Sequence, residues 1–534
     1  MIACPWRLAL AGCALVAAVA ARAETLTVKM EAGECWWGLH TRPRFIETPF
    51  DANSKDYVFD LRRDNNANQA VPLLLSTHGR YVWCEEPFLF AMTNGTMTFT
   101  AAAKIELVMA GKTLASAFAA AQARHFPPSG KTPPEIFVTA PQYNSWIELT
   151  YNQNERDLLR YARNLLALGF PPGILMVDDT WQLDYGTWEF DPRRFKDPKG
   201  MCDELHAMGF KVMLWICPFV SMDSPAYRLV YGKHGFLRSA VDDEPLAVRW
   251  WNGRSAVLDL SNRVDREWFD EVLAALQRDY GIDGFKFDAG DTEYYCHPSA
   301  RPAQAGFTPV EQNGAWSDLG LRYPYNEFRA SWKHGGQPLV QRLCDKGHSW
   351  GDLKRLVPEM IGAGLLGHAF VCPDMIGGGL WTDFLPGGKL EPELFVRSAQ
   401  VHALCPMMQF SADPSRVLRG EYLEAVKAAV QTRQRFAAYL KEQLVASGRT
   451  GLPMLRSLDF AYPGRGYERC RDEFLLGPSL LVAPQLEKGA SSRTVIVPPG
   501  DWRADDGTLV HGPAEVTVAT PLGRLPHFVL TKED

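Results

Sequence analysis

Residues 284–291 read GFKFDAGD, a short apolar run that ends in the carboxylate of Asp288 and a small-residue loop. Before it, the apolar residues of 265–276 recur every three to four positions, and a GIDG turn follows at 281–284. This order predicts a helix, a turn and a buried strand, which is the repeating unit of an α/β barrel. Such a strand delivers Asp288 to the carboxyl-terminal mouth of the barrel, where barrel enzymes carry out their chemistry.

The same rhythm of strands and amphipathic helices fills the middle of the chain. Strand candidates lie at 136–140, 173–177, 211–217, 284–288, 338–343, 368–372 and 402–410. Strands that alternate with helices predict a parallel sheet, and about eight such units predict a closed (β/α)8 barrel. We therefore predict a TIM barrel over residues 136–445. The stretch 294–336 matches no unit of the barrel, so we expect an irregular insertion there, as a lid or a partner surface.

The regions on both sides of the barrel have the two-residue alternation of β-strands. Residues 24–135 alternate in this way, as in 26–30 and 81–84, and the Pro-rich stretch 127–134 is typical of a linker. From residue 446 the strand pattern returns, at 474–476, 480–484 and 494–497. The chain is thus predicted to be an α/β protein, with an N-terminal β-sandwich at 24–135 and a C-terminal β-sandwich at 446–534.

The first residues resemble an export signal. Arg7, an apolar run from Leu8 to Ala20 and a small-x-small site at 21–23 predict a signal peptide over residues 1–23 and an exported, periplasmic or secreted protein. Cys13 ends a stretch similar to a lipoprotein box, but too few apolar residues precede it, so cleavage after Ala23 is favoured. No later segment has the ~20 apolar residues of a membrane span, so membrane insertion is not expected.

Charge and cysteine content exclude several classes of function. The net charge of −6 is spread over both signs, and no basic stripe indicates a nucleic-acid partner. Once Cys4 and Cys13 are removed, nine of the 11 cysteines remain, an odd number without CxxC or HExxH motifs. A disulfide framework, a zinc site and a thiol nucleophile are therefore disfavoured. We expect no metal and no organic cofactor.

Several motifs together resemble one enzyme family. The sequence Lys286-Phe287-Asp288 is similar to the nucleophile strand of the clan of retaining α-glycosidases that contains glycoside hydrolase family 31. Stretches at 451–458, 472–484 and 497–502 look like successive signatures of that family in the correct order. The KFDAG string and the acidic pair at 178–179 resemble its myogenesis-regulating glycosidase branch. The resemblance covers roughly residues 136–530.

This resemblance implies a retaining, exo-acting α-glycosidase with two carboxyl groups roughly 5 Å apart. It identifies Asp288 as the nucleophile. Trp350-Gly351-Asp352 resembles the family's Trp-x-Gly-Asp element, shortened by one residue, so Asp352 is the predicted acid/base. Two alternatives stay open: Asp352 caps the following helix, or the shortened element has shifted and Asp345 is the donor.

The adjacent carboxylates Asp178 and Asp179 bear on the substrate. Like charges this close need cationic or hydroxyl partners, and sugar hydroxyls are such partners. The pair resembles the Asp-Asp-x-Trp element with which α-galactosidases of the clan hold the 4- and 6-hydroxyls. It favours an α-galactosidase, with α-glucosidase, α-xylosidase and sulfoquinovosidase as alternatives. A catalytically silent carbohydrate-binding relative also stays open, since Asp291 replaces the Glu that is usual in that branch.

Five further side chains are candidate substrate ligands. Lys286 points to the same side of its strand as the nucleophile, to bind a sugar hydroxyl or to form a buried ion pair. Trp146 and Trp215 lie near strand ends, to stack on a sugar or to belong to the core. By resemblance, Arg342 binds a sugar hydroxyl or pairs with an acid, and Asp374 lies near the bound sugar. The expected partner is an α-linked oligosaccharide or glycoside, and a homo-oligomer is compatible with the sequence.

Overall fold

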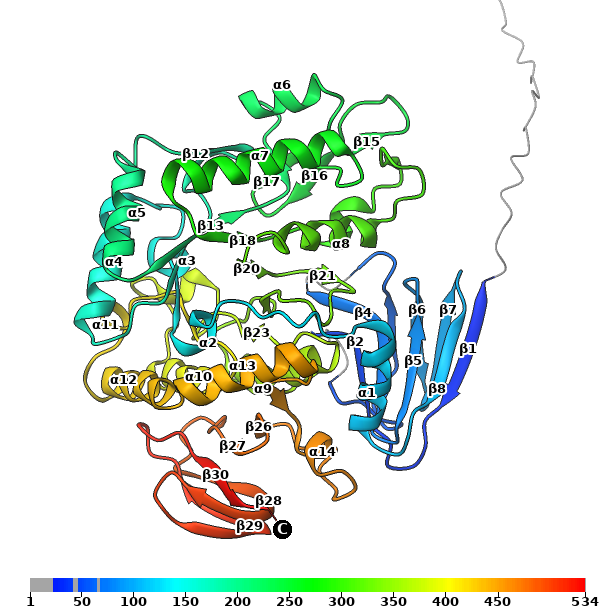
Figure 1. Cartoon of the computed structure of the whole chain (residues 1–534), viewed down its shortest axis with the longest axis vertical. Helices are drawn as coiled ribbons and strands as arrows, with labels where there is room; N and C mark the ends of the chain where they lie inside the picture. Colours follow the sequence, from blue (N-terminus) through cyan, green and yellow to red (C-terminus); the bar gives the residue numbers. More distant parts are fainter. Residues whose placement is uncertain (1–22, 42–46, 65–67, 534) are drawn as a thin grey trace, which may run out of the picture.

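The computed structural model describes residues 23–41, 47–64 and 68–533. A central barrel lies beside an N-terminal β domain, drawn in blue, and above a C-terminal β domain, drawn in orange to red (Figure 1). The predicted α/β architecture of a barrel flanked by two β domains is confirmed. Residues 1–22, which hold most of the predicted signal peptide, lie outside the described residues.

The barrel sheet has eight parallel strands in the order β24-β9-β10-β13-β18-β20-β22-β23. Its ends, β23 and β24, are bridged by a hydrogen bond of 2.8 Å from the Ile376 N–H to the Gln409 carbonyl, so the barrel is nearly closed. The strands are β9 (Gln142–Asn144), β10 (Ile174–Val177), β13 (Lys211–Ile216), β18 (Gly284–Phe287), β20 (Tyr325–Phe328), β22 (Gln341–Arg342), β23 (Val371–Cys372) and β24 (Gln409–Phe410).

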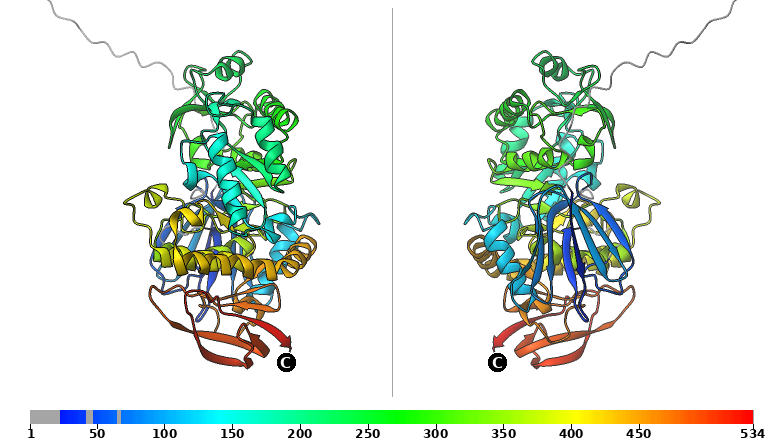
Figure 2. Two further views of the ribbon diagram at one scale, coloured as in Figure 1. Left: turned by 90° about the vertical axis from the view of Figure 1, so that its left-hand side faces the viewer. Right: turned by 90° about the vertical axis from the view of Figure 1, so that its right-hand side faces the viewer.

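Helices surround this sheet (Figure 2), and their buried apolar side chains belong to the same core cluster as those of the barrel strands. The predicted helix at 265–276 is part of α7, which begins after the cap Asn262 and ends at Gly281 in a left-handed conformation. Burial of each large apolar side chain of α7, such as Phe269, contributes about 1.5–3 kcal/mol. The longer helices are α4 (Glu155–Ala167), α5 (Pro198–Ala207), α7 (Arg263–Tyr280), α8 (Pro309–Gly320), α9 (Trp350–Leu365), α10 (Pro392–Ala403), α12 (Gly420–Arg435) and α13 (Ala437–Thr450).

Three of the predicted barrel elements are wrong in detail. Residues 136–139 form one turn of helix, α2 (Ile136–Thr139), whose Phe137 and Val138 are buried, and the first strand is β9 instead. Of residues 402–410, only Gln409–Phe410 form a strand, β24. Residues 402 and 403 belong to the end of α10, and a turn and loop lie between. The supposed insertion 294–336 contains α8 and the fifth barrel strand, β20. It is therefore a unit of the barrel.

The N-terminal β domain consists of two antiparallel sheets, ordered β1-β7-β6-β3 and β2-β4-β5-β8. Side chains alternate between core and surface, so Met97 and Phe99 of β7 are buried between partly exposed threonines. Helix α1 (Leu114–His125) packs on β4 and β5. The strands are β1 (Glu24–Lys29), β2 (Trp36–His40), β3 (Tyr57–Asp60), β4 (Gln69–Ser76), β5 (Arg80–Cys84), β6 (Leu89–Thr93), β7 (Thr96–Ala101) and β8 (Ile105–Met109).

One segment of the barrel chain joins the N-terminal domain. Strand β21 (Ser331–Trp332), just after β20, pairs in parallel with β4, so that Ser331 lies opposite Gln69 and Trp332 opposite Ala70. The two elements are side by side in Figure 1. The N-terminal domain therefore holds a loop that leaves the mouth of the barrel.

The C-terminal β domain is a six-stranded antiparallel sheet in the order β25-β26-β27-β30-β28-β29. Its core contains Val495, Val497 and Trp502, all fully buried. The strands are β25 (Leu455–Arg456), β26 (Phe474–Leu476), β27 (Leu480–Val482), β28 (Ser492–Ala504), β29 (Leu509–Ala519) and β30 (His527–Lys532).

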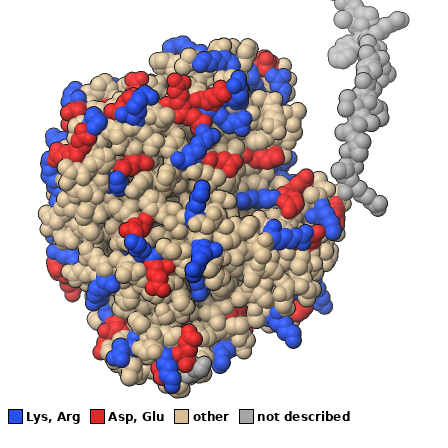
Figure 3. Space-filling view, viewed as in Figure 1, with Lys and Arg blue, Asp and Glu red and all other residues tan. Residues whose placement is uncertain are grey.

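Surface properties agree with the composition. On the face shown in Figure 3, acidic and basic side chains are interspersed and form no stripe of one sign. Within the described ranges, no helix combines the length and the apolar character that a bilayer crossing requires.

Candidate active site

The backbone after β18 turns sharply and leaves Asp288 at the barrel mouth. Ala289 and Gly290 both adopt positive φ, 57° and 75°, a conformation that L side chains rarely take. A Cβ atom at Gly290 would lie 2.2 Å from the indole of Trp316, so glycine is required there by space as well. The strand itself is fully buried between β13 and β20. This geometry fixes the direction of the Asp288 carboxylate.

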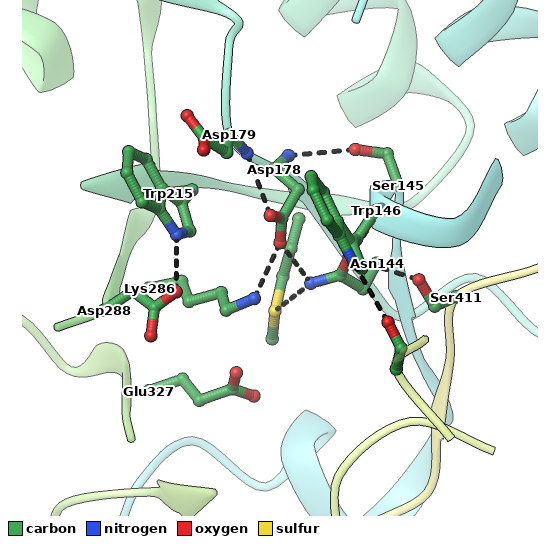
Figure 4. Close-up of polar contacts among 12 residues, drawn as sticks. Asn144, Ser145, Trp146, Asp178, Asp179, Trp215, Lys286, Asp288, Glu327 and Ser411 are labelled. Carbon is green, nitrogen blue, oxygen red and sulfur yellow. Dashed lines mark hydrogen bonds and ion pairs between the residues drawn. The ribbon is translucent and has the colours of Figure 1, made fainter. Parts of the chain in front are cut away.

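The carboxylate of Asp288 is held by an indole and by positive charges. Trp215, on β13, donates from Nε1 to Asp288 Oδ2 over 2.8 Å, as Figure 4 shows. Arg342 Nη2 lies 3.5 Å and Arg329 Nε 3.9 Å from Asp288 Oδ1. Burial raises the pKa of Asp288, but the charges of the arginines and of Lys286 outweigh it and keep the pKa below its ordinary value. Asp288 is therefore an anion at the mouth of the barrel.

Lys286 forms a buried ion pair with Asp178. Its Nζ lies 2.7 Å from Asp178 Oδ2, and each side chain is 4% exposed. Asn144 donates to the same oxygen over 2.8 Å, and Ser145 Oγ accepts from the Asp178 N–H over 2.9 Å (Figure 4). Of the two interpretations of Lys286, the structure contains the ion pair with a neighbouring barrel acid. Asp178 is thus held on β10 by its own protein partners.

The carboxylate of Asp179 is held by a different set of polar side chains. Tyr185 OH donates to its Oδ1 over 3.1 Å, and Asn252 Nδ2 donates to its Oδ2 over 2.7 Å. The Tyr151 hydroxyl in turn donates to Asn252 Oδ1 over 3.2 Å. Burial, with the nearby charge of Asp178, raises the pKa of Asp179 to about 7. This carboxyl group therefore changes protonation near neutral pH.

The two candidate tryptophans have different surroundings. Trp215 is 1% exposed, so its visible function is the hydrogen bond to the nucleophile. Trp146, at the start of α3 (Trp146–Leu149), is partly exposed and donates to the Gly379 carbonyl over 3.1 Å. Its ring meets Tyr151 edge to face at 5.2 Å, and Tyr151 meets Trp381 at 6.4 Å. The rings of Trp146, Tyr151 and Trp381 thus form a row of aromatic contacts next to the end of β9.

A single guanidinium joins three of the carboxylates. Arg342 Nη1 donates to Asp345 Oδ1 over 2.6 Å and to Asp374 Oδ1 over 3.0 Å, and its Nη2 is the atom near Asp288. Asp374 is fully buried, and its other oxygen accepts from the Lys346 N–H over 2.9 Å. Burial and the charge of Asp345 raise the pKa of Asp374 to about 6. The Asp345 side chain, in contrast, is 60% exposed.

Asp352 has a structural role in this arrangement. It is the third residue of α9, after the cap Ser349, and its Oδ2 accepts from the Gly347 N–H over 2.8 Å and from Ser349 Oγ over 3.1 Å. Its other oxygen pairs with Arg355. In the part of the chain that the structure describes, no hydrogen bond or ion pair links Asp352 to Asp288 or Arg342. Asp352 therefore supports the start of α9 from its first turn, while Ser349 and not Asp352 is the N-cap. Asp345, in contrast, shares the Arg342 guanidinium with Asp288.

Two residues of the site, the partly exposed Arg329 and the buried Glu327, were not predicted from the sequence. Arg329, directly after β20, pairs with Asp291 (3.3 Å) as well as Asp288, and its guanidinium lies over Trp251 at 5.1 Å. Glu327, opposite Lys286 in the β18–β20 register, accepts from Gln409 over 2.7 Å. Both belong to the stretch that we expected to be an insertion. An apolar residue at each end of Tyr325–Phe328 is the one strand signal there.

The described residues contain one cluster of possible metal ligands, and it lies in the C-terminal domain. Cys470, Asp472 and Glu473 bring their ligating atoms within 4.8 Å of one another. Arg493 Nη2, however, lies 3.0 Å from Asp472 Oδ2 and 3.3 Å from Glu473 Oε2. The arginine already balances these charges, so the cluster does not fit a metal site.

Comparisons with known proteins agree with this architecture. The model of the glycosyl hydrolases family 31 TIM-barrel domain matches residues 141–342, and that of the family 31 C-terminal domain matches residues 451–531. Between them, the matches span just over half of the chain.

Curated relatives match over long segments. Myogenesis-regulating glycosidase of Mus musculus is 31% identical over 399 residues, which cover 72% of this chain and 55% of that protein. Sulfoquinovosidase of Escherichia coli is 25% identical over 375 residues, 64% of this chain and 52% of that protein. The chain spans about half the length of the curated relatives it matches.

Solved structures share the fold. A family 31 α-xylosidase from a soil metagenome, complexed with xylose, superposes with a TM-score of 0.82 at 20% identity, over 95% of this chain and 79% of that chain. A dextranase of Flavobacterium johnsoniae, complexed with glucose, gives 0.81 at 18% identity, over 95% and 66%.

Proposed function

Because the chain belongs to glycoside hydrolase family 31, we propose that it is a retaining α-glycosidase that releases terminal α-linked sugars, with Asp288 as its nucleophile. The observation that carries the proposal is the shared guanidinium of Arg342, which contacts both Asp288 and the exposed Asp345. A retaining mechanism needs two carboxyl groups roughly 5 Å apart, and the shared guanidinium supports this pairing because it holds the carboxylates of Asp288 and Asp345 on neighbouring nitrogen atoms.

In this proposal Asp345, not Asp352, is the acid/base. Its accessible side chain supports the choice, because a proton donor must reach the leaving oxygen. Asp352 is occupied by two hydrogen bonds at the start of α9 and an ion pair with Arg355. In the free protein, the charges of Arg342 and Arg329 outweigh the effect of desolvation and lower the pKa of Asp345. A substrate that covers the side chain removes water from it, which raises its pKa toward that of an acid.

The reaction then has two balanced steps. An Asp288 oxygen attacks the anomeric carbon, the bond to the leaving oxygen breaks, and that oxygen takes the proton of Asp345. Asp345, now a carboxylate, accepts a proton from water, whose oxygen attacks the anomeric carbon and displaces Asp288. Loss of the Asp288 charge in the ester lowers the proton affinity of Asp345 between the steps, and ester cleavage restores it.

For the substrate we propose an α-galactoside. Asp178 and Asp179 support this choice because they lie at the mouth in the order of the Asp-Asp-x-Trp element, with Trp181 following. Asp178 is held by Lys286 and Asn144, so one carboxylate is oriented before any sugar arrives. α-Glucosides, α-xylosides and sulfoquinovosides are the alternatives within the family.

The test compares 4-nitrophenyl α-galactoside with the α-glucoside, α-xyloside and sulfoquinovoside, each with Asp288→Ala as the inactive control. Release from the galactoside alone supports both parts of the proposal. Release from another glycoside keeps the mechanism and overturns the substrate. Release that persists in Asp288→Ala overturns the nucleophile, and a protein that binds sugar but is silent on all four supports a non-catalytic relative.

A further inference from the structure

A buried glutamine of the N-terminal β domain is bonded to the backbone of both arginines that contact the nucleophile. Gln69, the first residue of β4, is fully buried. Its Nε2 donates to the Arg329 carbonyl over 2.8 Å and to the Arg342 carbonyl over 2.9 Å. One side chain of a flanking domain thus links the ends of two neighbouring barrel strands.

The orientation of the Gln69 amide is determined by its partners. A primary amide has two N–H donors, and both face carbonyl oxygens that can only accept. Its own oxygen, Oε1, accepts from the Thr41 hydroxyl over 3.1 Å. A reversed amide would direct Oε1 at two carbonyls and leave three acceptors facing one another, so the bonding pattern is unambiguous.

Backbone pairing strengthens the same link. Strand β21 begins two residues after Arg329 and continues the N-terminal sheet beside β4, with Ser331 opposite Gln69. Lys333 then donates from its N–H to the Ala70 carbonyl over 3.2 Å. The backbone from Arg329 to Lys333 is therefore held by the N-terminal domain on one side and on the other by α8, whose Ser317 hydroxyl donates to the Ala330 carbonyl over 3.4 Å.

The guanidinium of Arg329 depends on this backbone because its side-chain contacts direct it poorly. Its Nε lies 3.3 Å from Asp291 and 3.9 Å from Asp288, but Arg329 Nε and both Asp291 oxygens form no hydrogen bond within the described residues. Charge attraction alone fixes distance better than direction. The position of the Arg329 guanidinium is then set mainly by the position of the Arg329 main-chain atoms from which its side chain extends.

We propose that Gln69 is a positioning residue, which fixes Arg329 and Arg342 against the nucleophile and makes the N-terminal domain part of the catalytic apparatus. Its kinetic consequences rest on the proposed function, whereas its structural consequence does not. A small displacement of groups that hold a reacting atom costs activity even when the fold survives.

The variant Gln69→Met removes both hydrogen bonds at nearly constant side-chain volume. We expect kcat/KM to fall roughly ten- to a hundredfold. We also expect the acidic limb of its pH profile to move to higher pH, because arginines that retreat stabilise the Asp288 anion less. The charged and titratable groups that face Asp288 are Lys286, Arg329, Arg342, Asp291, Asp345, Tyr294 and Cys217, and the substitution changes none of them.

Gln400→Met is the matched control. Gln400 is also buried between the barrel and a flanking domain, with Nε2 donating to the Leu522 carbonyl over 2.7 Å and Oε1 accepting from Arg397 over 3.0 Å. A general loss of domain contacts lowers Tm in both variants, but only Gln69→Met should move the pH limb. The inference would be overturned if Gln69→Met kept the acidic limb and the kcat/KM of the wild type. Equal losses of kcat/KM in Gln69→Met and Gln400→Met would also overturn it.

A crystal structure of Gln69→Met decides the matter without turnover. The guanidinium groups of Arg329 and Arg342 should be displaced from Asp288, and undisplaced arginines reject the inference. If the wild type hydrolyses no glycoside, the proposed function fails, and the crystal structure of Gln69→Met alone tests the positioning role of Gln69. If Gln69→Met does not fold, the variant Thr41→Val replaces it in the test. This variant removes only the hydrogen bond to Gln69 Oε1 and should produce the same changes in milder form. A Thr41→Val protein that behaves like the wild type would count against the inference.

Discussion

The indole nitrogen of Trp215 donates a 2.8 Å hydrogen bond to the carboxylate of Asp288. The two residues lie at the ends of adjacent strands, β13 and β18, so the barrel itself sets their distance. A hydrogen bond to an ionised acceptor stabilises the anion and is worth about 1.5–3 kcal/mol. Trp215 therefore orients the Asp288 carboxylate and stabilises its anion, in addition to the charges of Arg329, Lys286 and Arg342.

Replacement of Trp215 by Phe should expose this role. Loss of the N–H raises the pKa of Asp288, and since the carboxylate is the active form, the acidic limb of kcat/KM should shift to higher pH. We expect a loss of roughly ten- to a hundredfold in kcat/KM at neutral pH, from the bond energy above. A pH–rate profile that is unchanged while KM rises would instead indicate that the ring binds sugar.

The acid/base assignment is tested by the pair Asp345→Asn and Asp352→Asn. Asp345→Asn should lose roughly a hundredfold or more on a glycoside with a poor leaving group, and less on the 4-nitrophenyl glycoside, which needs little protonation. Asp352→Asn should keep its kcat on both substrates. The reverse result would restore Asp352 as the proton donor.

The capping role of Asp352 predicts an effect on stability. Asp352→Ala removes the acceptor for the Gly347 N–H and the partner of Ser349, so unfolding free energy should fall by about 0.5–2 kcal/mol with kcat retained. Chemical denaturation with parallel assays measures both quantities. Unchanged stability together with lost activity contradicts the capping role.

The Lys286–Asp178 pair predicts a non-additive double mutant. Lys286→Met leaves a buried carboxylate without its cation and should destabilise the protein by roughly 3–5 kcal/mol. Adding Asp178→Asn removes the uncompensated charge, so the double variant should be more stable than Lys286→Met alone. Denaturation of the four proteins gives the coupling energy, and additive changes would mean that the pair is not coupled.

Asp179 predicts a pH dependence of stability. Its pKa is about 7 in the folded protein against 3.8 for the free side chain, so its contribution is fully present below about pH 3.8 and is lost as pH rises through 7. The wild type should therefore lose stability relative to Asp179→Asn between pH 5 and pH 8. A constant difference between the two proteins over that range contradicts the raised pKa.

The parts of the fold that local sequence determines were predicted correctly. The helix-turn-strand pattern before Asp288 is uninterrupted, and its apolar residues bury on both faces of a parallel strand, as such strands require. Strand β20 was missed because two of its four residues, Asn326 and Glu327, are polar and buried. Their partners, such as Gln409, come from distant segments, so no local sequence pattern indicates that Asn326 and Glu327 are buried.

The site shows the same division between local and distant signals. Asp345 and Arg342 are three residues apart in sequence, but only the barrel brings Arg342, with Asp345 bound to it, to Asp288. The role of Asp352 was readable locally, since Ser349-x-x-Asp352 before an apolar helix is a capping-box pattern. The galactoside preference, the domain boundaries and export stay predictions.

The central claim is a covalent glycosyl-Asp288 intermediate. The most direct measurement is to incubate the protein with a 5-fluoro-α-glycosyl fluoride of the preferred sugar, digest it and locate the adduct by mass spectrometry. We predict one added glycosyl group on the peptide that contains Asp288, with none in Asp288→Asn. An adduct on another carboxylate, or a turned-over reagent that leaves no adduct and gives the inverted sugar, would contradict the account.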